Sequence, residues 1–288
     1  VTLDPNEGKT VVEIIEDIIS NKIKGLYVQG ENPAMSDPDQ SHARKALAKL
    51  EHLVVQDIFM TETAWHADVI LPASAHAEKN GTYTNTNRQV QLGRAAVDSP
   101  GNVKQDWWII QEIANRMGLN WNYKSPKDVF NEMKFIMPSL NNISWERLER
   151  EGFVTYPVES EFTLGKDIIF NDGFPTPNKL AKIIPTKLIM PNDELNNEFP
   201  MILSTGRLLE HWHTGTMTRR SLILDELEPD PIIFINRSDF KNYNLDINKK
   251  IKVETRRGKI DINLRLDDDL LPGMIFLPFC FKEAAANI

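Results

Sequence analysis

Residues 54–72 read VVQDIFMTETAWHADVILP, two short apolar runs on either side of a polar loop. Together with Leu53, the first run predicts a strand at Leu53–Val55, and the second predicts one at Val69–Leu71. A further buried strand is predicted upstream, at Leu26–Val28, and helical patterns separate these strands. Helices between short apolar strands imply right-handed crossovers and a parallel sheet. The first part of the chain is therefore predicted to be an α/β domain.

Several segments around these strands carry helical signals. Thr10 is followed three residues later by Glu13, the spacing of a capping box. Gly118 suits the end of a helix, and Ser125 and Ser144 suit helix starts. The predicted helices begin at Thr10, run from Ala43 to Leu50 and from Asp106 to Met117, and follow Ser125 and Ser144 as far as Gly152.

The pattern changes in the second half of the chain. Residues 154–198 are rich in Pro and Asn with little periodicity, and we interpret them as a connector with one strand at Lys179–Ile184. Beyond Phe199, short apolar runs are separated by turns such as Leu271–Gly273, which is typical of a β-barrel. The predicted barrel strands are Met201–Leu203, Ile232–Ile235, Ile251–Thr255, Lys259–Leu266 and Met274–Leu277. The expected organisation is an α/β domain at 1–153, a connector at 154–198 and a barrel at 199–288.

Composition limits the functional classes. The chain has 288 residues, 41% apolar and 26% charged, which is typical of a globular protein. No apolar run approaches the roughly 18 residues of a membrane span, and Val1–Lys9 is unlike a signal peptide, so we expect a cytoplasmic protein. A net charge of −8 argues against nucleic-acid binding. The single cysteine, Cys280, excludes an internal disulfide and an iron–sulfur cluster, which takes about four thiolates.

Polar residues follow the predicted parallel strands, where ligands of open α/β sheets bind. Gly30 and Asn32 come after the first strand; glycine lets the backbone approach a phosphate, and Asn32 offers a donor and an acceptor. Asp57 ends the second strand, where a carboxylate can accept from a ribose hydroxyl or a guanine, and Thr61–Thr63 and Ser74 complete the rim. A plain turn at Gly30–Pro33 and an Asp57 that caps a helix around Thr61 are the alternatives.

Residues 205–220, TGRLLEHWHTGTMTRR, form the second candidate site. They hold three arginines against one acid, and arginine binds phosphate with paired donors. Gly215 frees neighbouring amides, and His211 and His213 should lie on the same side of an extended segment. The segment favours a polar heterocycle that bears phosphate.

Other interpretations of these segments remain open. His211 and His213 could be metal ligands, although no third ligand is evident nearby. The segment could also be a surface loop with Trp212 packed into the core. A Ser–His–Asp hydrolase would use Ser74 and His76, but the Gly-x-Ser-x-Gly elbow is absent from the sequence.

Both candidate sites resemble one known family. Residues 54–72 are similar to the third domain of the molybdopterin oxidoreductases, and Glu78, Gly81–Thr82, Asn87–Arg88 and Asp106–Trp107 continue the pattern. His211–Arg219 looks like formate dehydrogenase, and Pro278–Phe281 with Glu283–Asn287 resembles its soluble, NAD-linked type. The resemblance covers nearly the whole chain.

The resemblance implies a Rossmann-like domain followed by a double-psi β-barrel, both binding the molybdenum cofactor bis-molybdopterin guanine dinucleotide. The residues that it assigns to the guanosine end are Gly30, Asn32, Asp57, Thr61 and Asp106. Those that it assigns to the barrel are Arg207, His211, His213, Thr214 and, as a weaker match, Asn287.

The resemblance also implies what the chain lacks. In this family the metal-ligating cysteine or selenocysteine, the catalytic histidine and the iron–sulfur ligands lie in an N-terminal half. We therefore expect a fragment with no catalytic residue, no metal ligand and no turnover of its own. The barrel would be incomplete, because relatives continue beyond Ile288 with a further strand. Cys280, in the motif of the last predicted strand, is expected to be inert packing.

The implied activity of the intact enzyme is oxidation of formate to carbon dioxide. Two electrons would pass through the pterin and iron–sulfur clusters to an acceptor such as NAD. The implied partners are the missing N-terminal domains and flavin- or NAD-binding electron-transfer subunits.

Three rival functions remain: a cofactor-free scaffold subunit of a respiratory NADH dehydrogenase, a nitrate reductase or other oxotransferase of the family, and a standalone binding module. The stretch His211–Arg219 favours a cofactor-binding protein, since a scaffold has no physical need for it.

Overall fold

The computed structural model describes residues 5–191 and 193–287; Val1–Asp4, the residue at 192 and Ile288 lie outside this description. The chain forms two compact units. Unit 1 combines residues 1–70 with 190–288, and unit 2 comprises residues 71–189. Most of the N-terminal sheet thus shares a unit with the C-terminal sheet, although more than a hundred residues separate them in sequence.

The N-terminal part of unit 1 starts with α1 (Val11–Ile19). Thr10 is its N-cap and forms the predicted capping box: its backbone N–H donates to Glu13 Oε2 at 2.7 Å. β1 (Gly25–Gln29) and β2 (His52–Asp57) pair in parallel, with Val28 opposite Val55. β3 (Val69–Pro72) adds to β2 in the order β1-β2-β3. The three predicted strands and the parallel pairing of the first two are confirmed.

Two helices connect β1 to β2. α2 (Pro33–Ser36) is a single turn, and α3 (Gln40–Leu47) begins three residues before the predicted helix because Asp39 caps it, accepting from His42 N at 3.1 Å. α1 and α3 contact each other through buried side chains, and a second apolar cluster includes the inner residues of β1 and β2. The buried residues of these two clusters are Ile15, Ile18, Val28, Ala34, Ala43, Ala46, Leu47, Leu53, Val55 and Ala64.

The C-terminal part of unit 1 is a mixed five-stranded sheet in the order β7-β11-β8-β10-β9. β11 pairs with β7 in parallel, as β10 does with β8, and the other two pairings are antiparallel. All five predicted strands are confirmed, at Ile202–Gly206 (β7), Ile232–Ile235 (β8), Ile251–Glu254 (β9), Lys259–Leu266 (β10) and Met274–Pro278 (β11). Two short helices, α7 (Leu222–Leu227) and α8 (Arg237–Asn242), were not predicted. Cys280 lies two residues beyond β11, not within a strand.

Unit 2 combines three helices with a small antiparallel sheet. α4 (Asp106–Arg116), α5 (Pro126–Ile136) and α6 (Trp145–Glu151) confirm the predicted helices, with Ser125 and Ser144 as N-caps. β4 (Gly81–Thr84), β5 (Gln89–Gly93) and β6 (Phe153–Thr155) form a sheet that was not predicted. Val90 and Val154 on the sheet pack with Phe130, Ile143 and Leu148 in the core of this unit.

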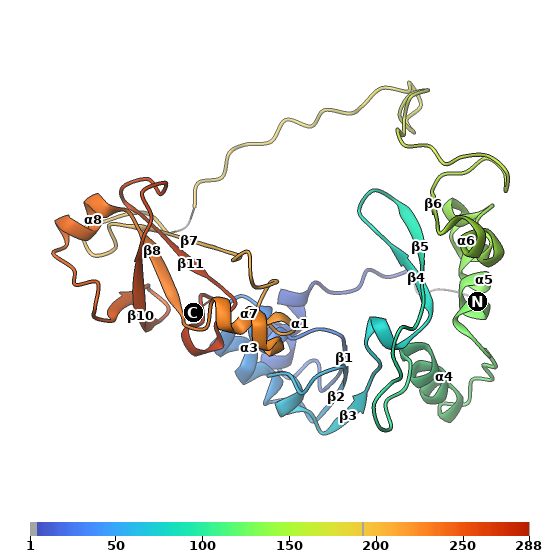
Figure 1. The fold of residues 1–288 in the computed structure, drawn as a ribbon, viewed down its shortest axis with the longest axis horizontal. Helices are drawn as coiled ribbons and strands as arrows, with labels where there is room; N and C mark the ends of the chain where they lie inside the picture. The colour runs from blue at the N-terminus through green and yellow to red at the C-terminus, as the bar shows by residue number, and fades with distance from the viewer. Residues whose placement is uncertain (1–4, 192, 288) are drawn as a thin grey trace. The chain divides into compact units, whose positions relative to one another are not determined.

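Between β6 and β7 the described residues contain no helix or strand (Figure 1). The predicted strand at Lys179–Ile184 is therefore wrong. Lys179 adopts a φ of 59°, its carbonyl accepts from Phe174 N at 2.9 Å, and Ile183 is 90% exposed. A local turn thus takes the backbone groups that a strand would need for a ladder.

Arginine side chains fasten the first part of this connection within unit 2. Arg88 donates to the carbonyls of Lys166 and Asp167, and the buried Arg147 donates to those of Ser160 and Thr163. No helix in the described part of the chain is long and apolar enough to span a membrane.

Candidate functional site

The loop after β1 turns sharply at Gly30. Gly30 adopts a φ of 61°, a conformation that favours glycine, and its N–H donates to Gln56 O at 2.9 Å. A Cβ at this position would meet no atom within 4 Å, so the backbone conformation is the constraint. Asn32 then serves as N-cap of α2, with Pro33 at the first helical position.

Asn32 is buried, and its side-chain amide uses all of its hydrogen-bonding positions. Its Oδ1 accepts from the N–H of Thr63 at 3.1 Å and from the Thr63 hydroxyl at 2.8 Å. Its Nδ2 donates to Glu62 Oε2 at 2.9 Å and to Thr216 Oγ1 at 3.0 Å. A primary amide has two donors and two acceptor lone pairs, so Asn32 joins the loop after β2 to segment 205–220, which begins at the end of β7 in the C-terminal sheet.

The loop after β2 is shaped by Asp57 and Thr61. Asp57 Oδ1 accepts from the N–H of Ile58 at 2.7 Å and of Phe59 at 3.2 Å, so Asp57 caps its own turn and not a helix around Thr61. Thr61 is completely buried, and its Oγ1 accepts from Ala64 N at 3.1 Å. Both residues therefore fix the path of residues 57–64.

Segment 205–220 folds around Gly215. This glycine has a φ of 71°, and its N–H donates to Trp212 O at 2.9 Å. A Cβ here would lie 2.7 Å from Arg219 Cγ and 2.9 Å from the carbonyl oxygen of Cys280, so the space excludes a side chain. On either side, the hydroxyls of Thr214 and Thr216 lie 3.1 Å apart.

The two histidines of this segment have different surroundings. His211 is buried, and its Nε2 donates to Glu228 O at 2.9 Å. A carbonyl can only accept, so in the neutral ring Nδ1 is the acceptor nitrogen; among the described residues this atom has no partner. His213 is exposed, with a φ of 50°. The prediction that both rings lie on one side of an extended segment is wrong, because the backbone turns at His213.

Arg207 and Trp212 lie beside His213. Nη2 of Arg207 is 3.1 Å from His213 Nε2, and its guanidinium lies 5.2 Å from the centre of the Trp212 ring. Trp212 is 64% exposed, so the alternative in which it is packed into the core is wrong.

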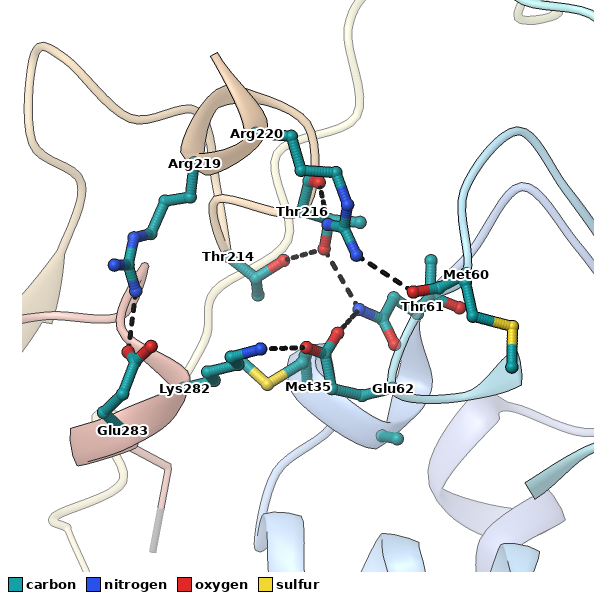
Figure 2. A network of polar contacts seen from close by, with 12 residues as sticks. Met35, Met60, Thr61, Glu62, Thr214, Thr216, Arg219, Arg220, Lys282 and Glu283 are labelled. Atoms are coloured by element: carbon teal, nitrogen blue, oxygen red, sulfur yellow. Dashed lines mark hydrogen bonds and ion pairs between the residues drawn. The ribbon is translucent and has the colours of Figure 1, made fainter. Parts of the chain in front are cut away.

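A polar cavity of about 270 Å³ lies in unit 1 where loops of the two sheets meet (Figure 2). Its walls include Thr214 and Thr216 together with three basic residues and two acids, which gives a formal excess of one positive charge. The charged residues are Arg219, Arg220, Lys282, Glu62 and Glu283.

Electrostatics differ along this cavity. Burial acts to raise the pKa of Glu62, but the hydrogen bond from Asn32 and the charges of Lys282 and Arg220 outweigh it, so the pKa lies below its ordinary value. Burial raises the pKa of the Cys280 thiol to about 11. Cys280 is therefore a neutral thiol at physiological pH, as expected of inert packing.

Asn287 connects the end of the chain to the first sheet. Its Nδ2 donates to the carbonyls of Met35 and Asp37, and its carbonyl accepts from Gln40 N at 2.9 Å. Asn287 therefore contributes to docking the two parts of unit 1.

Asp106 and Ser74 belong to unit 2. Asp106 is the first residue of α4 and forms an ion pair with Lys79. The Ser74 hydroxyl is completely buried and has no hydrogen-bond partner in the described part of the chain. A serine nucleophile needs a base within hydrogen-bond reach, so the arrangement does not support a hydrolase with Ser74 and His76.

The structure thus brings nine of the ten predicted site residues into unit 1 and places Asp106 in unit 2. Direct hydrogen bonds join Asn32 through Thr216 to Thr214. Arg220 and Lys282 line the cavity without having been predicted as site residues. The local excess of arginine was the sequence signal for Arg220; Lys282 had none. The described residues hold no group of three His, Cys, Asp or Glu side chains that could hold a metal ion.

Two family models match this chain. The molybdopterin oxidoreductase model matches residues 2–116, and the model described as molydopterin dinucleotide binding domain matches residues 201–288. Over these two segments the chain is similar to the molybdopterin oxidoreductase family.

Individual relatives agree with this family. The F420-dependent formate dehydrogenase subunit alpha of Methanocaldococcus jannaschii is 44% identical over 99% of this chain and 42% of its own length. The assimilatory nitrate reductase catalytic subunit of Bacillus subtilis is 33% identical over 97% of this chain and 41% of its own length. The chain therefore spans about two fifths of these relatives.

A solved structure shares the fold. Acetylene hydratase from Pelobacter acetylenicus superimposes with a TM-score of 0.74 at 23% sequence identity. The match covers 93% of this chain and 39% of that chain.

The donor set of unit 1 fits a molybdopterin dinucleotide. Such a ligand carries phosphates and heterocyclic rings with both donors and acceptors. The cavity provides hydroxyls and an excess of basic side chains. Outside the cavity lining, the buried His211 Nδ1 is an acceptor without a partner among the described residues. A buried polar atom of this kind requires a partner.

Proposed function

We propose that this chain is the cofactor-binding part of the alpha subunit of a molybdenum formate dehydrogenase. Formate would be oxidised to carbon dioxide in the intact subunit. The 44% identity to a formate dehydrogenase alpha subunit over nearly the whole chain supports this reaction. A nitrate reductase is the second candidate, supported by the 33% identity to the Bacillus subtilis enzyme.

One observation carries the proposal that both sheets of unit 1 serve one ligand. Asn32 follows the first strand and Thr216 lies in segment 205–220, 184 positions later, yet their side chains are 3.0 Å apart. Thr214 is joined to Thr216 in turn. A dinucleotide has two ends and a charged centre, and loops of two sheets that meet over a polar cavity suit such a ligand.

The proposed ligand is bis-molybdopterin guanine dinucleotide. We assign its guanosine end to the Rossmann-like domain, residues 1–153, and the remaining contacts to residues 199–288, the proposed counterpart of a double-psi barrel, with 154–198 as connector. When bound, the cofactor supplies the two-electron chemistry, and this chain binds and orients it. The assigned residues are Gly30, Asn32, Asp57, Thr61, Asp106, Arg207, His211, His213, Thr214 and Asn287.

The proposed partners follow from the same assignment. They are N-terminal domains of the same subunit, with the metal ligand and iron–sulfur clusters, and flavin- or NAD-binding electron-transfer subunits in the cytoplasm. The 288-residue chain alone is expected to show no formate-dependent dye reduction.

Guanine-nucleotide binding tests the proposal. Calorimetry on the 288-residue chain with GDP is expected to show binding, and AMP is expected to give none. Asp57→Asn retains one oxygen, which can still accept from the amides of Ile58 and Phe59. It replaces the other carboxylate oxygen, which would accept from guanine, by an amide nitrogen that can only donate. This variant is therefore expected to weaken GDP binding by at least about tenfold, the effect of losing a hydrogen bond to a charged group.

Asp246→Asn is the matched control. Asp246 caps a turn in the same way, accepting from Asn248 N at 3.0 Å, but lies in the loop before β9. Equal GDP and AMP binding, or equal loss of binding in both variants, would contradict the assignment of Asp57 as the guanine contact.

A further inference from the structure

Arg220 joins loops of the two sheets within unit 1. Its Nη1 donates to the carbonyl of Thr216 in its own segment, and its Nη2 donates to the carbonyl of Met60 at 3.0 Å, in the loop after β2 (Figure 2). The guanidinium also lies 5.0 Å from the centre of the Phe59 ring. One side chain therefore contacts residues on both sides of the proposed cofactor site.

The geometry requires an arginine. Two carbonyls on different segments are bridged by two nitrogens of one planar group, and the same plane lies over an aromatic ring. Lysine carries a single ammonium on a flexible stem and cannot reproduce this fork or its stacking. Arg220 forms no ion pair with a carboxylate among the described residues, so backbone groups are its direct partners.

The residues beside these carbonyls are those assigned to the cofactor. Met60 directly precedes Thr61 and lies three residues after Asp57. Thr216 accepts from Asn32 and contacts Thr214. A second contact parallels the bridge, since Lys282 Nζ lies 3.6 Å from Glu62 Oε1.

We propose that Arg220 is a positioning residue: by bridging the Met60 and Thr216 carbonyls it holds the loop that carries Asp57 and Thr61 against segment 205–220, which carries Thr214, and so preforms the cofactor site. This inference rests on the proposed function only for its ligand. The bridge itself is a property of the chain without ligand.

Hydrogen exchange tests the bridge on the 288-residue chain without nucleotide. Arg220→Gln is expected to raise exchange about tenfold at two sets of amides. One set is Ala64 and Trp65, which donate to Thr61; the other is Gly215 and Arg219. Arg220→Lys is expected to raise exchange at both sets as well, because it retains the charge but not the fork.

The matched control is Arg237→Gln. Arg237 is an exposed arginine of unit 1 whose Nε donates to Asp268 Oδ2 at 3.1 Å, so its loss changes charge equally without touching the bridge. Unchanged exchange in Arg220→Lys would overturn the proposal, since charge alone would then suffice. A rise confined to segment 205–220 would also overturn it, because the Met60 loop would not depend on Arg220.

GDP affinity adds a measurement that general destabilisation does not reproduce. We expect Arg220→Gln and Asn32→Ala each to weaken GDP binding. The double variant should lose affinity by a smaller factor than the product of the two single-variant factors, because both substitutions act on one linked pair of loops. Multiplicative losses would overturn the coupling. If the unaltered chain binds no guanine nucleotide, the proposed function fails, and the exchange result alone decides the role of Arg220.

Discussion

Glu62 is a charged residue held between two polar partners, Asn32 and Lys282. Its side chain is 20% exposed, whereas that of Lys282 is 58% exposed. Solvent therefore screens the ion pair, and the hydrogen bond from the buried Asn32 is the firmer contact.

The lowered pKa of Glu62 predicts an acid-dependent contribution to stability. The pKa of Glu62 is lower in the folded state than in the unfolded state, where a glutamate has a pKa of about 4.3. Ionised Glu62 therefore stabilises the folded state at a pH above the unfolded pKa. This stabilisation is lost as the pH falls through the folded pKa. Glu62→Gln is expected to lower the free energy of unfolding by about 0.5–1 kcal/mol at pH 7 and by nothing at the acid end. Urea denaturation of both proteins from pH 3 to pH 7 measures this difference, and a pH-independent difference would show that ionisation of Glu62 is not the cause.

The residues of the site were only partly predictable from sequence. Gly30, Asn32 and Asp57 stand where strands end, and that position is visible in the apolar pattern. Their hydrogen-bond partners are not visible. The side-chain amide of Asn32 bonds to Thr63, Glu62 and Thr216, and Thr216 is 184 residues away. A contact at such separation depends on how two sheets pack, which local sequence does not encode.

At the scale of elements, the connector directly after β6 has no helix or strand and is held by hydrogen bonds from the buried Arg147. The Arg147 side chain is 2% exposed, donates to the carbonyls of Asn142, Ser160 and Thr163, and pairs with Glu151 at 3.0 Å. The backbone from 157 to 163 forms no strand ladder, so these hydrogen bonds from a buried side chain hold the start of the connector to the rest of unit 2.

Removing this side chain is expected to be costly. Arg147→Ala would remove the side-chain donor of the Asn142 and Thr163 carbonyls and one of the two arginines that pair with Glu151, and should lower the free energy of unfolding of unit 2 by about 1–3 kcal/mol. Arg150→Ala is the matched control, because Arg150 is exposed and pairs with Glu151 alone, so the expected loss is below about 1 kcal/mol. Chemical denaturation followed by tryptophan fluorescence compares them, because four of the six tryptophans lie in unit 2. Similar losses would show that burial of Arg147 is not the cause.

Elements with local signals were predicted well, and elements that depend on partners were not. The helix starts at Thr10, Ser125 and Ser144 follow from side-chain caps, and β8 and β10 have the predicted bounds because their apolar residues are continuous or alternate. The sheet β4-β5-β6 was missed because its third strand lies some sixty residues after the second. The apolar residues at Lys179–Ile184 suggested a strand, but the segment has no partner among the described residues.

The whole molecule has an inserted architecture, in which unit 2 interrupts the sequence of unit 1. Each unit has its own hydrophobic core: Ile233 belongs to a core of unit 1, and Leu148 belongs to that of unit 2. Separate cores allow separate cooperative unfolding.

We therefore predict two thermal transitions. Ile233→Ala, which empties a fully buried position in β8, should lower the midpoint of one transition, at a cost of about 2–5 kcal/mol. Leu148→Ala should lower the other. Calorimetry of the 288-residue chain measures both, and a single transition that both variants shift equally would contradict independent unfolding.

Gly215 links two segments in a way that bears on the evolution of this chain. Its missing side chain leaves just enough space for the carbonyl of Cys280, 65 residues later. A side chain at position 215 thus demands a change of backbone path at position 280, whereas the contact places no demand on the residue type at 280, because it involves the backbone carbonyl. Descendants of this sequence that acquire a side chain at position 215 must have rebuilt the turn after β11 first or at the same time, so the two segments are expected to be inherited as a pair.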